Sequence, residues 1–471
     1  MTKRISRRAF LRAFGGSAAL AGSSALLAAC GGQPATTGGN ATATGAGATA
    51  ASVPTSGAVA PTTVSQTGSA VEITYWGSFS GALGEAEQAM VKAFNDSQQD
   101  VRVNYQFQGS YEETAQKLTA ALRAKTTPDL SLLSDVWWFR FYLAKALTPL
   151  DELAKGAGVD FADYQPVLIN EGVREGMHYW VPFARSTPLF YYNKDVWAEA
   201  GLPDRGPETW QEFQEWAPKL VKKDGDTLTR AAFAHPSAGS YIAWLFQGVV
   251  WQFGGSYSTP DFKITLNDPN SIRAAQFYRD SVNTFKWATT PKELDKDFLG
   301  GQVASMMAST GGLAGYEKNA TFKVGTAFLP KEANFGCCTG GAGLAILSSA
   351  PVEKQQAAMK YIAFATSTEG TTNWSQSTGY MPVRQSAVQG EQMQAFFTQR
   401  PNFKVAVDQL PQTKAQDAAR VFIPGGDQII GKGLERITVG NEDPATVWKD
   451  VTVELEEAAQ PVLKDLAALK G

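Results

Sequence analysis

Histidine and cysteine are scarce in this 471-residue chain, which contains two histidines and three cysteines. A structural zinc site, or a scaffold of several disulfides, needs more of these residues than the chain provides. Lysine and arginine number 42 and aspartate and glutamate 45, which gives a net charge of −3. Nucleic-acid-binding domains normally carry a surplus of basic residues. The composition therefore argues against these classes, and we expect no metal, no cofactor and no nucleic-acid partner.

Two of the three cysteines, Cys337 and Cys338, are neighbours in the sequence. Their α-carbons lie about 3.8 Å apart across a trans peptide, whereas ordinary disulfides join α-carbons roughly 4.4–6.8 Å apart. We expect two small buried thiols before a glycine turn. A strained disulfide between the neighbours is the alternative.

Two motifs of hydrolytic enzymes are also missing. The chain has no Gly-x-Ser-x-Gly nucleophile elbow and no His-Glu-x-x-His zinc motif. Carboxylates are plentiful, but no spacing singles out the acid–base pair that a glycoside hydrolase needs. We therefore expect no catalytic residue and no enzymatic activity, with an exported glycoside hydrolase as a less favoured alternative.

The N-terminal segment, residues 1–29, has the organisation of an export signal. A basic stretch containing the pair Arg7-Arg8 precedes a run of small apolar residues. The pair lies in Ser-Arg-Arg-Ala-Phe-Leu-Arg, which is typical of twin-arginine (Tat) export. The run ends in Leu-Ala-Ala-Cys at residues 27–30, which resembles the lipobox of bacterial lipoproteins. We predict a signal peptide over residues 1–29 and a lipidated Cys30.

Residues 30–70 are predicted to be a disordered tether. From residue 31 to residue 70 the chain has no charged and no aromatic side chain, and consists almost entirely of Ala, Thr, Gly, Ser, Pro and Val. Such a segment buries too little apolar surface to offset the entropy of ordering. About 40 flexible residues have a root-mean-square reach of roughly 35 Å. The tether would let a folded body stand off a membrane.

The rest of the chain is rich enough in apolar residues for a large core, and it begins with a β–α–β–α–β pattern. Alternating apolar residues predict strands over residues 71–76 and 101–107, a short apolar run predicts a third strand over residues 128–133, and helical periodicity predicts helices over residues 85–98 and 112–125. Such alternation favours a mostly parallel sheet. Ligands of parallel sheets bind beyond the carboxyl ends of the strands. We therefore expect ligand contacts near Ser78, Tyr111 and Asp135.

Four later segments carry a family resemblance. Residues 186–195 read Ser-Thr-Pro-Leu-Phe-Tyr-Tyr-Asn-Lys-Asp, and Ala-Gly-Leu-Pro follows at residues 200–203. Residues 340–346 and 377–383 contain Gly-Gly-Ala-Gly-Leu-Ala-Ile and Ser-Thr-Gly-Tyr-Met-Pro-Val. Together these segments resemble landmarks of the extracellular solute-binding proteins of ABC importers, family 1, which binds maltodextrins and other sugars. Within that family the chain is most similar to the group that binds sn-glycerol 3-phosphate.

The resemblance implies an α/β fold of two lobes, each a mostly parallel sheet flanked by helices, with the ligand in the cleft between them. It places lobe I at residues 71–185 with residues 338–378 returning to it. Lobe II would comprise residues 186–337 with residues 379–471 returning. It also implies closure of the lobes about a hinge around the ligand, and delivery to the transmembrane subunits of a permease.

Several ligand-contacting positions of the family match this sequence. The positions carried over are Tyr111, Asp135, Ser186, Ser309, Thr310, Gly341 and Tyr380. The group that binds glycerol 3-phosphate stacks its ligand on two tryptophans, which are replaced here by Ala238 and Tyr241, and Trp244 lies one turn away. Arg420 lies about two residues out of register with a family arginine. The predicted ligand site consists of Ser78, Tyr111, Asp135, Ser186, Tyr241, Trp244, Ser309, Thr310, Gly341, Tyr380 and Arg420.

The departures at Ala238, Tyr241 and Arg420 favour a neutral sugar or oligosaccharide as the ligand. Glycerol 3-phosphate or a glycerophosphodiester is the alternative. A structural surface lipoprotein is a further, less favoured alternative. We expect an exported monomer that is anchored through Cys30 to the outer face of the cytoplasmic membrane.

Overall fold

The computed structural model describes residues 69–237 and 239–470. The predicted signal peptide, the lipidation site at Cys30, nearly all of the tether and Ala238 lie outside the described residues. Among the residues that are described, no helix has the length and apolar character needed to cross a membrane.

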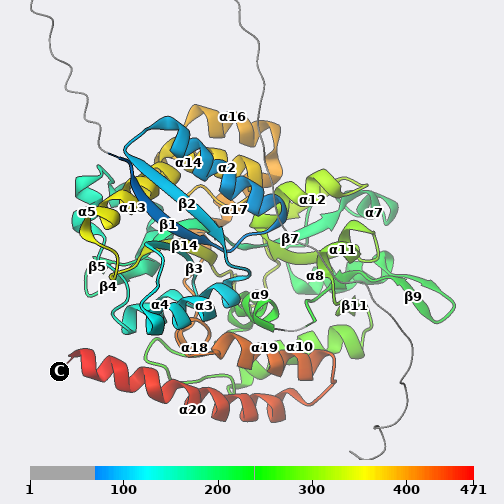
Figure 1. Cartoon of the computed structure of the whole chain (residues 1–471). Helices are drawn as coiled ribbons and strands as arrows, with labels where there is room; N and C mark the ends of the chain where they lie inside the picture. The colour runs from blue at the N-terminus through cyan, green and yellow to red at the C-terminus, as the bar shows by residue number, and fades with distance from the viewer. Residues whose placement is uncertain (1–68, 238, 471) are drawn as a thin grey trace, which may run out of the picture. The chain divides into compact units, whose positions relative to one another are not determined.

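The first sheet has the strand order β2-β1-β3-β14-β6 (Figure 1). Its strands are β1 (Val71–Gly77), β2 (Val101–Phe107), β3 (Leu130–Ser134), β6 (Val181–Ser186) and β14 (Gly340–Ile346). β1 pairs in parallel with β2 and β3, whereas β14 pairs antiparallel with β3 and β6. Ile73 and Tyr75 of β1 are completely buried, as the alternation predicts.

Helices cover the first sheet and confirm the predicted β–α–β–α–β order. They include α2 (Gly81–Ser97), α3 (Tyr111–Ala124), α4 (Trp138–Leu143), α5 (Asp151–Gly156), α6 (Pro166–Ile169), α13 (Val352–Ala365) and α14 (Thr368–Thr378). Ser110 begins α3 with a capping box, because its side chain accepts from the backbone of Glu113 while the Glu113 carboxylate accepts from the backbone of Ser110. Short 3-10 turns η1 (Phe161–Asp163) and η2 (Asn170–Gly172) and the hairpin β4 (Val173–Arg174) and β5 (Met177–His178) join these elements.

The second sheet has the order β11-β10-β12-β7-β13. Its strands are β7 (Pro188–Asn193), β10 (Phe233–Ala234), β11 (Ala288–Thr289), β12 (Ser305–Ser309) and β13 (Val324–Ala327). β10 pairs in parallel with β11 and β12, whereas β7 pairs antiparallel with β12 and β13. The prediction of two α/β units with mostly parallel sheets is confirmed. Each sheet also contains one strand that runs against the other four, β14 in the first sheet and β7 in the second.

The second sheet and the C-terminal part of the chain carry the remaining elements. These are α7 (Lys194–Glu199), α8 (Trp210–Leu220), β8 (Lys222–Asp224), β9 (Thr227–Arg230), α9 (Gly239–Gln252), α10 (Pro269–Asn283), α11 (Leu294–Leu299), η3 (Thr310–Gly312), α12 (Leu313–Asn319), α15 (Gln385–Gln389), α16 (Glu391–Gln399), α17 (Pro401–Gln409), η4 (Leu410–Gln412), α18 (Ala418–Val421), α19 (Gly426–Thr438) and α20 (Pro444–Lys470). Thr209 caps α8 by accepting from the backbone of Glu212.

Two connections between the sheets lie side by side. β6 of the first sheet leads through Thr187 into β7 of the second, and β14 returns the chain from the second sheet to the first. Ser186 pairs with Gly340 across these connections. β6 leads out of the first sheet, and β14 runs back into it beside β6. The two strands are therefore antiparallel. This crossing explains why the first sheet is mixed.

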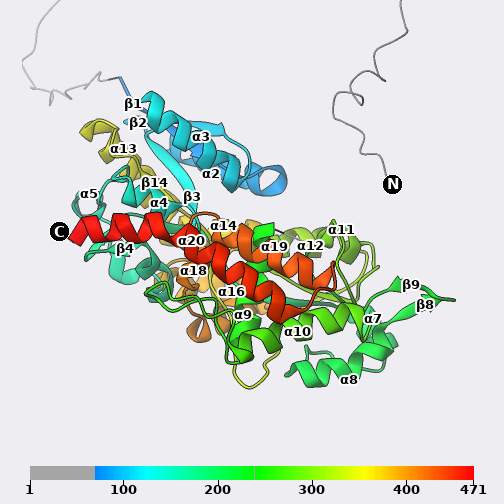
Figure 2. The same ribbon diagram turned by 90° about the horizontal axis from the view of Figure 1, so that it is seen from below.

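The long helix α20 contacts both halves of the molecule, namely the first sheet with its helices and the second sheet with the helices that pack with it (Figure 2). It packs along α19 and α10. Further along the helix, Val462 joins a buried apolar cluster with Leu118 of α3 and Trp138 of α4. Burial of apolar side chains at this point contributes about 25 cal/mol for each Å² removed from water. The C-terminal helix therefore adds an apolar contact between the two halves.

Candidate functional site

A cavity of about 440 Å³ lies where the first sheet meets the helices of the C-terminal segment and α9. We call it the main cavity. It is lined by Ser110, Tyr111, Glu112, Ser134, Asp135, Val136, Trp137, Ser240, Tyr241, Trp244, Ser309, Gly341, Tyr380, Arg420, Gly425, Asp427 and Gln428. Elements of both halves contribute, so the cavity matches the predicted cleft between lobes.

The N-terminal ends of three helices converge on the main cavity. Lining residues lie at the start of α3 (Ser110), of α9 (Ser240) and of α19 (Asp427). The first turn of a helix has unpaired N–H groups and carries the positive end of the helix dipole. Three such ends favour negative charge at one place, as in many phosphate-binding sites.

Aromatic rings form much of the remaining wall. Tyr241 and Trp244, spaced i and i+3 on α9, have ring centroids 5.7 Å apart, as the predicted shared face requires. Tyr111 and Tyr380 both pack against Phe79. Burial raises the pKa of Tyr111, and raises the pKa of Tyr380 to about 12. Both hydroxyls therefore stay protonated at neutral pH and are able to donate.

Asp135 follows β3 and provides a buried carboxylate. Its backbone N–H donates to the carbonyl of Gly341 at 3.0 Å. Nε2 of Gln416 donates to its Oδ2 at 2.5 Å, and Nη1 of Arg185 lies 4.0 Å from the same oxygen. Arg185 is held in turn by two hydrogen bonds to the carboxylate of Glu171, at 2.8 and 2.7 Å. The side chain of Asp135 is thus positioned by Gln416 and Arg185.

Arg420 lies on α18 with 4% of its surface exposed. Nη1 donates to Oε1 of Gln416, and Nη2 to the hydroxyl and carbonyl of Ser240, at 3.2 and 3.3 Å. Among the described residues, Nε of Arg420 and the Ser134 hydroxyl have no hydrogen-bond partner. Buried polar groups are normally satisfied. These two atoms on the wall of the main cavity are therefore suited to bind a polar solute.

The structure brings together most of the residues predicted for the ligand site. Eight line the main cavity: Tyr111, Asp135, Tyr241, Trp244, Ser309, Gly341, Tyr380 and Arg420. Ser78 instead lies at the ends of β1 and β2, in a separate cavity of about 670 Å³, and its hydroxyl pairs with that of Thr114 at 2.8 Å. Ser186 is buried at the crossing beside Gly340, and Thr310 is completely buried.

Further lining residues were not included in the predicted site. Asp427 and Gln428 belong to the first turn of α19. Pro424-Gly425-Gly426 directly before them is a turn signal that marks a helix start, and this signal was available in the sequence. Trp137 lines the main cavity whereas Trp138 does not, because adjacent residues of a helix point to different sides.

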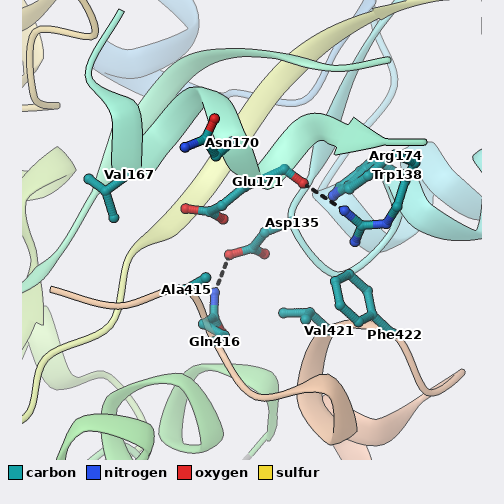
Figure 3. Close-up of a pocket in the computed structure, with 10 residues that line it drawn as sticks. All are labelled: Asp135, Trp138, Val167, Asn170, Glu171, Arg174, Ala415, Gln416, Val421 and Phe422. Carbon is teal, nitrogen blue, oxygen red and sulfur yellow. Dashed lines mark hydrogen bonds between the residues drawn. The ribbon is translucent and has the colours of Figure 1, made fainter. Parts of the chain in front are cut away.

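A second cavity, of about 380 Å³, adjoins the same carboxylate; we call it the rear cavity (Figure 3). Its lining residues are Asp135, Trp138, Val167, Asn170, Glu171, Arg174, Ala415, Gln416, Val421 and Phe422. The guanidinium of Arg174 stacks on the rings of Trp138 and Phe422 at 4.8 and 4.7 Å. Asp135 lines both cavities, so the pair that it forms with Gln416 lies at their boundary.

The histidines and the cysteine pair lie outside the main cavity. His235 is buried against Tyr278, and burial lowers its pKa to about 3. His178 contacts Asp151 at 2.8 Å. Cys337 and Cys338 are buried free thiols, as expected. Within the described part of the chain, no group of His, Cys, Asp or Glu side chains is arranged to hold a metal ion.

Gly341 is expected to tolerate no side chain. Its φ is +108°, and a Cβ would lie 2.1 Å from the carbonyl oxygen of Ala184. Replacement of Gly341 by alanine should lower the free energy of unfolding by about 2 kcal/mol, because both the backbone strain and the clash must be relieved. Thermal denaturation monitored by circular dichroism measures the change.

Gly315→Ala is the matched control for this substitution. Gly315 lies within α12, and a Cβ there meets no described atom within 4 Å. Alanine in a helix is favoured over glycine by roughly 0.5–1 kcal/mol, so this variant should be unchanged or slightly more stable. Equal Tm values for the two variants would contradict the argument.

Comparison with known proteins identifies the family. Residues 89–405 match the family model described as bacterial extracellular solute-binding protein. The chain belongs to this family. As a member, it is a solute-binding protein of an ABC importer, which confirms the resemblance found in the sequence. The binding-protein names of the relatives agree with the expectation of a binding protein rather than an enzyme.

Three similar proteins show how far the likeness extends in sequence and in structure. The sn-glycerol-3-phosphate-binding periplasmic protein UgpB of Pectobacterium atrosepticum is 27% identical over 399 residues, which cover 80% of this chain and 88% of the relative. The structure of UgpB from Mycobacterium tuberculosis in complex with glycerophosphocholine is 42% identical, with a TM-score of 0.78, and the match covers 84% of this chain and all of that one. A Thermotoga lettingae solute-binding protein bound with α-D-tagatose has the same fold, at 22% identity, TM-score 0.71 and coverage of 83% and 100%.

Proposed function

We propose that this solute-binding protein captures a glycerophosphodiester, with glycerophosphocholine as the representative ligand. The observation that carries the proposal is the meeting of three helix N-termini and Arg420 at one cavity. A phosphodiester anion suits such a place. The complex of glycerophosphocholine with a 42% identical UgpB supports the same ligand class.

Further groups that line the main cavity suit the remaining parts of that ligand. The carboxylates of Asp135, Asp427 and Glu112 complement a cationic head group or accept from glycerol hydroxyls. The rings of Trp137 and Tyr241 offer faces to a quaternary ammonium group. The main cavity therefore offers groups of both signs to a ligand with one anionic and one cationic part.

A neutral sugar is the second candidate, and it is the ligand that the sequence alone favoured. The aromatic rings and carboxylates that line the cavity are also groups that hold sugars by stacking and hydrogen bonds. The two candidates differ in their need for Arg420, because a neutral ligand offers no anion to the guanidinium.

Calorimetry distinguishes the two candidates. The full chain would be titrated with glycerophosphocholine, sn-glycerol 3-phosphate, choline and a panel of neutral sugars. We expect glycerophosphocholine to bind with a Kd of about 10 μM or tighter, which corresponds to roughly 7 kcal/mol, and choline and the sugars to bind far more weakly. Tight binding of a neutral sugar without binding of either phosphate compound would reverse the proposal.

The proposed mechanism is closure of the two halves around the ligand, followed by delivery to the permease subunits. Both halves line the main cavity, so only a closed form makes all the contacts, and the ligand biases the equilibrium towards that form. A change from mostly open to mostly closed requires about 5.5 kcal/mol of differential affinity. Small-angle X-ray scattering with and without glycerophosphocholine tests this mechanism, and tight binding at constant radius of gyration would refute it.

We also propose that the protein is a monomer anchored to the outer face of the membrane through diacylglycerol on Cys30, after twin-arginine export. The support is the lipobox-like segment ending at Cys30 and the uncharged tether that follows. In cells, Cys30→Ala should prevent lipid modification and release the protein from membranes. Mass spectrometry of the mature N-terminus checks this, and an unmodified terminus far from residue 30 would contradict the anchor.

A further inference from the structure

A single neutral side chain connects two of the charged groups that line the main cavity, Asp135 and Arg420. Gln416 is buried between η4 and α18. Its Nε2 donates to the carboxylate of Asp135, and its Oε1 accepts from the guanidinium of Arg420. The direction of these bonds is fixed by chemistry, because a carboxylate only accepts and a guanidinium only donates. The amide is therefore oriented by both partners at once (Figure 3 shows its contact with Asp135).

The backbone beside Gln416 is fixed to the helices of the second half. The carboxylate of Asp417 accepts from the side chains of Gln247 and Trp251 on α9, at 2.9 and 3.2 Å, and from the backbone of Tyr257 at 2.7 Å. Asp135 in contrast follows β3 of the first sheet. Gln416 thus reaches from one half of the molecule to the other.

We propose that Gln416 is the positioning residue that sets the charge preference of the solute site. Gln416 separates the carboxylate of Asp135 from the guanidinium of Arg420. Its hydrogen bonds occupy one oxygen of the carboxylate and one nitrogen of the guanidinium. Nε of Arg420, which has no partner among the described residues, then remains for an anionic group of the solute. This role of Gln416 extends the proposed function, and it rests on that function because it requires a phosphate-bearing ligand.

A charged side chain at position 416 would disrupt the hydrogen bonds that join Asp135 and Arg420 through Gln416. Gln416→Glu places a second carboxylate against Arg420, where it pairs with the guanidinium, and next to Asp135, which it repels. Buried pairs of like charge are strongly unfavourable. Gln416→Met removes both hydrogen bonds at similar volume without adding charge. The exposed Gln412, four residues earlier, provides Gln412→Glu as a control with the same change in charge.

The test measures the affinity of each variant for two probes by calorimetry. We expect Gln416→Met to weaken glycerophosphocholine by roughly tenfold and sn-glycerol 3-phosphate by roughly thirtyfold, because without the amide the carboxylate of Asp135 competes with the anion for Arg420. Gln416→Glu should weaken the zwitterionic glycerophosphocholine by roughly tenfold and the dianionic glycerol 3-phosphate by roughly a hundredfold. The ratio of the two affinities is the decisive quantity, since a merely structural role would move both probes equally. Gln412→Glu should leave both affinities unchanged.

Small-angle scattering of the unliganded variants supplies a second readout that needs no ligand. Gln416→Glu should raise the radius of gyration above that of the wild type and of Gln412→Glu, because repulsion from Asp135 separates the halves. If the wild type binds neither probe, the proposed function fails, and the scattering still decides whether Gln416 joins the halves. If the wild type binds both probes and Gln416→Glu changes neither their ratio nor the scattering, the role of Gln416 is refuted alone.

Discussion

Replacing Arg420 with methionine is expected to weaken the binding of glycerophosphocholine by about a hundredfold. Hydrogen bonds to charged groups contribute about 1.5–3 kcal/mol, and a hundredfold change in Kd corresponds to about 2.7 kcal/mol. Arg420 is buried, lines the main cavity and has Nε without a partner among the described residues. A phosphodiester bound in the main cavity would lose that charged donor. Calorimetry of the variant gives the change directly.

Two further variants make the Arg420 result specific. Arg420→Lys keeps the charge but loses the planar fork of donors, so its affinity should lie between those of the wild type and Arg420→Met. Arg436→Met is the control, because Arg436 pairs with Glu442 and Asp450 at 2.7 and 3.0 Å and does not line the main cavity. Binding of glycerophosphocholine by Arg420→Met at wild-type affinity would remove the anion from the proposed function.

The buried carboxyl of Glu87 is expected to make the stability of the protein depend on pH. Tyr75 and Tyr105 donate to its two oxygens at 2.5 and 2.7 Å, yet burial raises its pKa from 4.5 to about 7. Between these values the folded protein holds a proton that the unfolded chain releases. The free energy of unfolding should therefore be greatest below pH 4.5 and fall by about 3 kcal/mol as the pH rises to about 7.

Urea unfolding at several values between pH 4.5 and 8 tests the role of Glu87. Glu87→Gln cannot ionise, so its stability should lack the Glu87-dependent fall with pH and exceed that of the wild type most at neutral pH. Glu85→Gln, on the exposed side of α2, should follow the pH profile of the wild type. Parallel profiles for the wild type and Glu87→Gln would show that the carboxyl is not the source of the dependence.

Local patterns were sufficient to predict the beginning of the fold. Alternation predicted the strands that became β1 and β2, and helical periodicity predicted the helices α2 and α3. These patterns depend on which face of an element is buried, and that information lies within a few neighbouring residues. The direction of β14 was not accessible in this way, because it depends on where the chain crosses between the sheets.

Some residues of the candidate site were likewise predictable from local sequence patterns, and others were not. Tyr111 and Asp135 follow strands that the sequence places at the edge of one sheet, and Tyr241 and Trp244 share a helical face by spacing alone. The helix start before Asp427 was also marked locally, by the turn that precedes it. Gln416 differs from all of these, because its neighbours in the sequence give no sign of the two charges that it joins.

The sequence by itself determined the class of this protein: an α/β chain of two units, with the composition and motifs of a solute-binding protein and a site rich in tyrosine and tryptophan. Tertiary structure alone decided that Nε of Arg420 has no partner among the described residues, that three helix N-termini meet at the main cavity, and that Ser78, Ser186 and Thr310 lie elsewhere. The reason is physical. Burial patterns and caps arise from contacts between near neighbours, whereas the charge of a cavity arises from groups such as Asp135 and Arg420, which are hundreds of residues apart and meet only after the chain has crossed between its sheets.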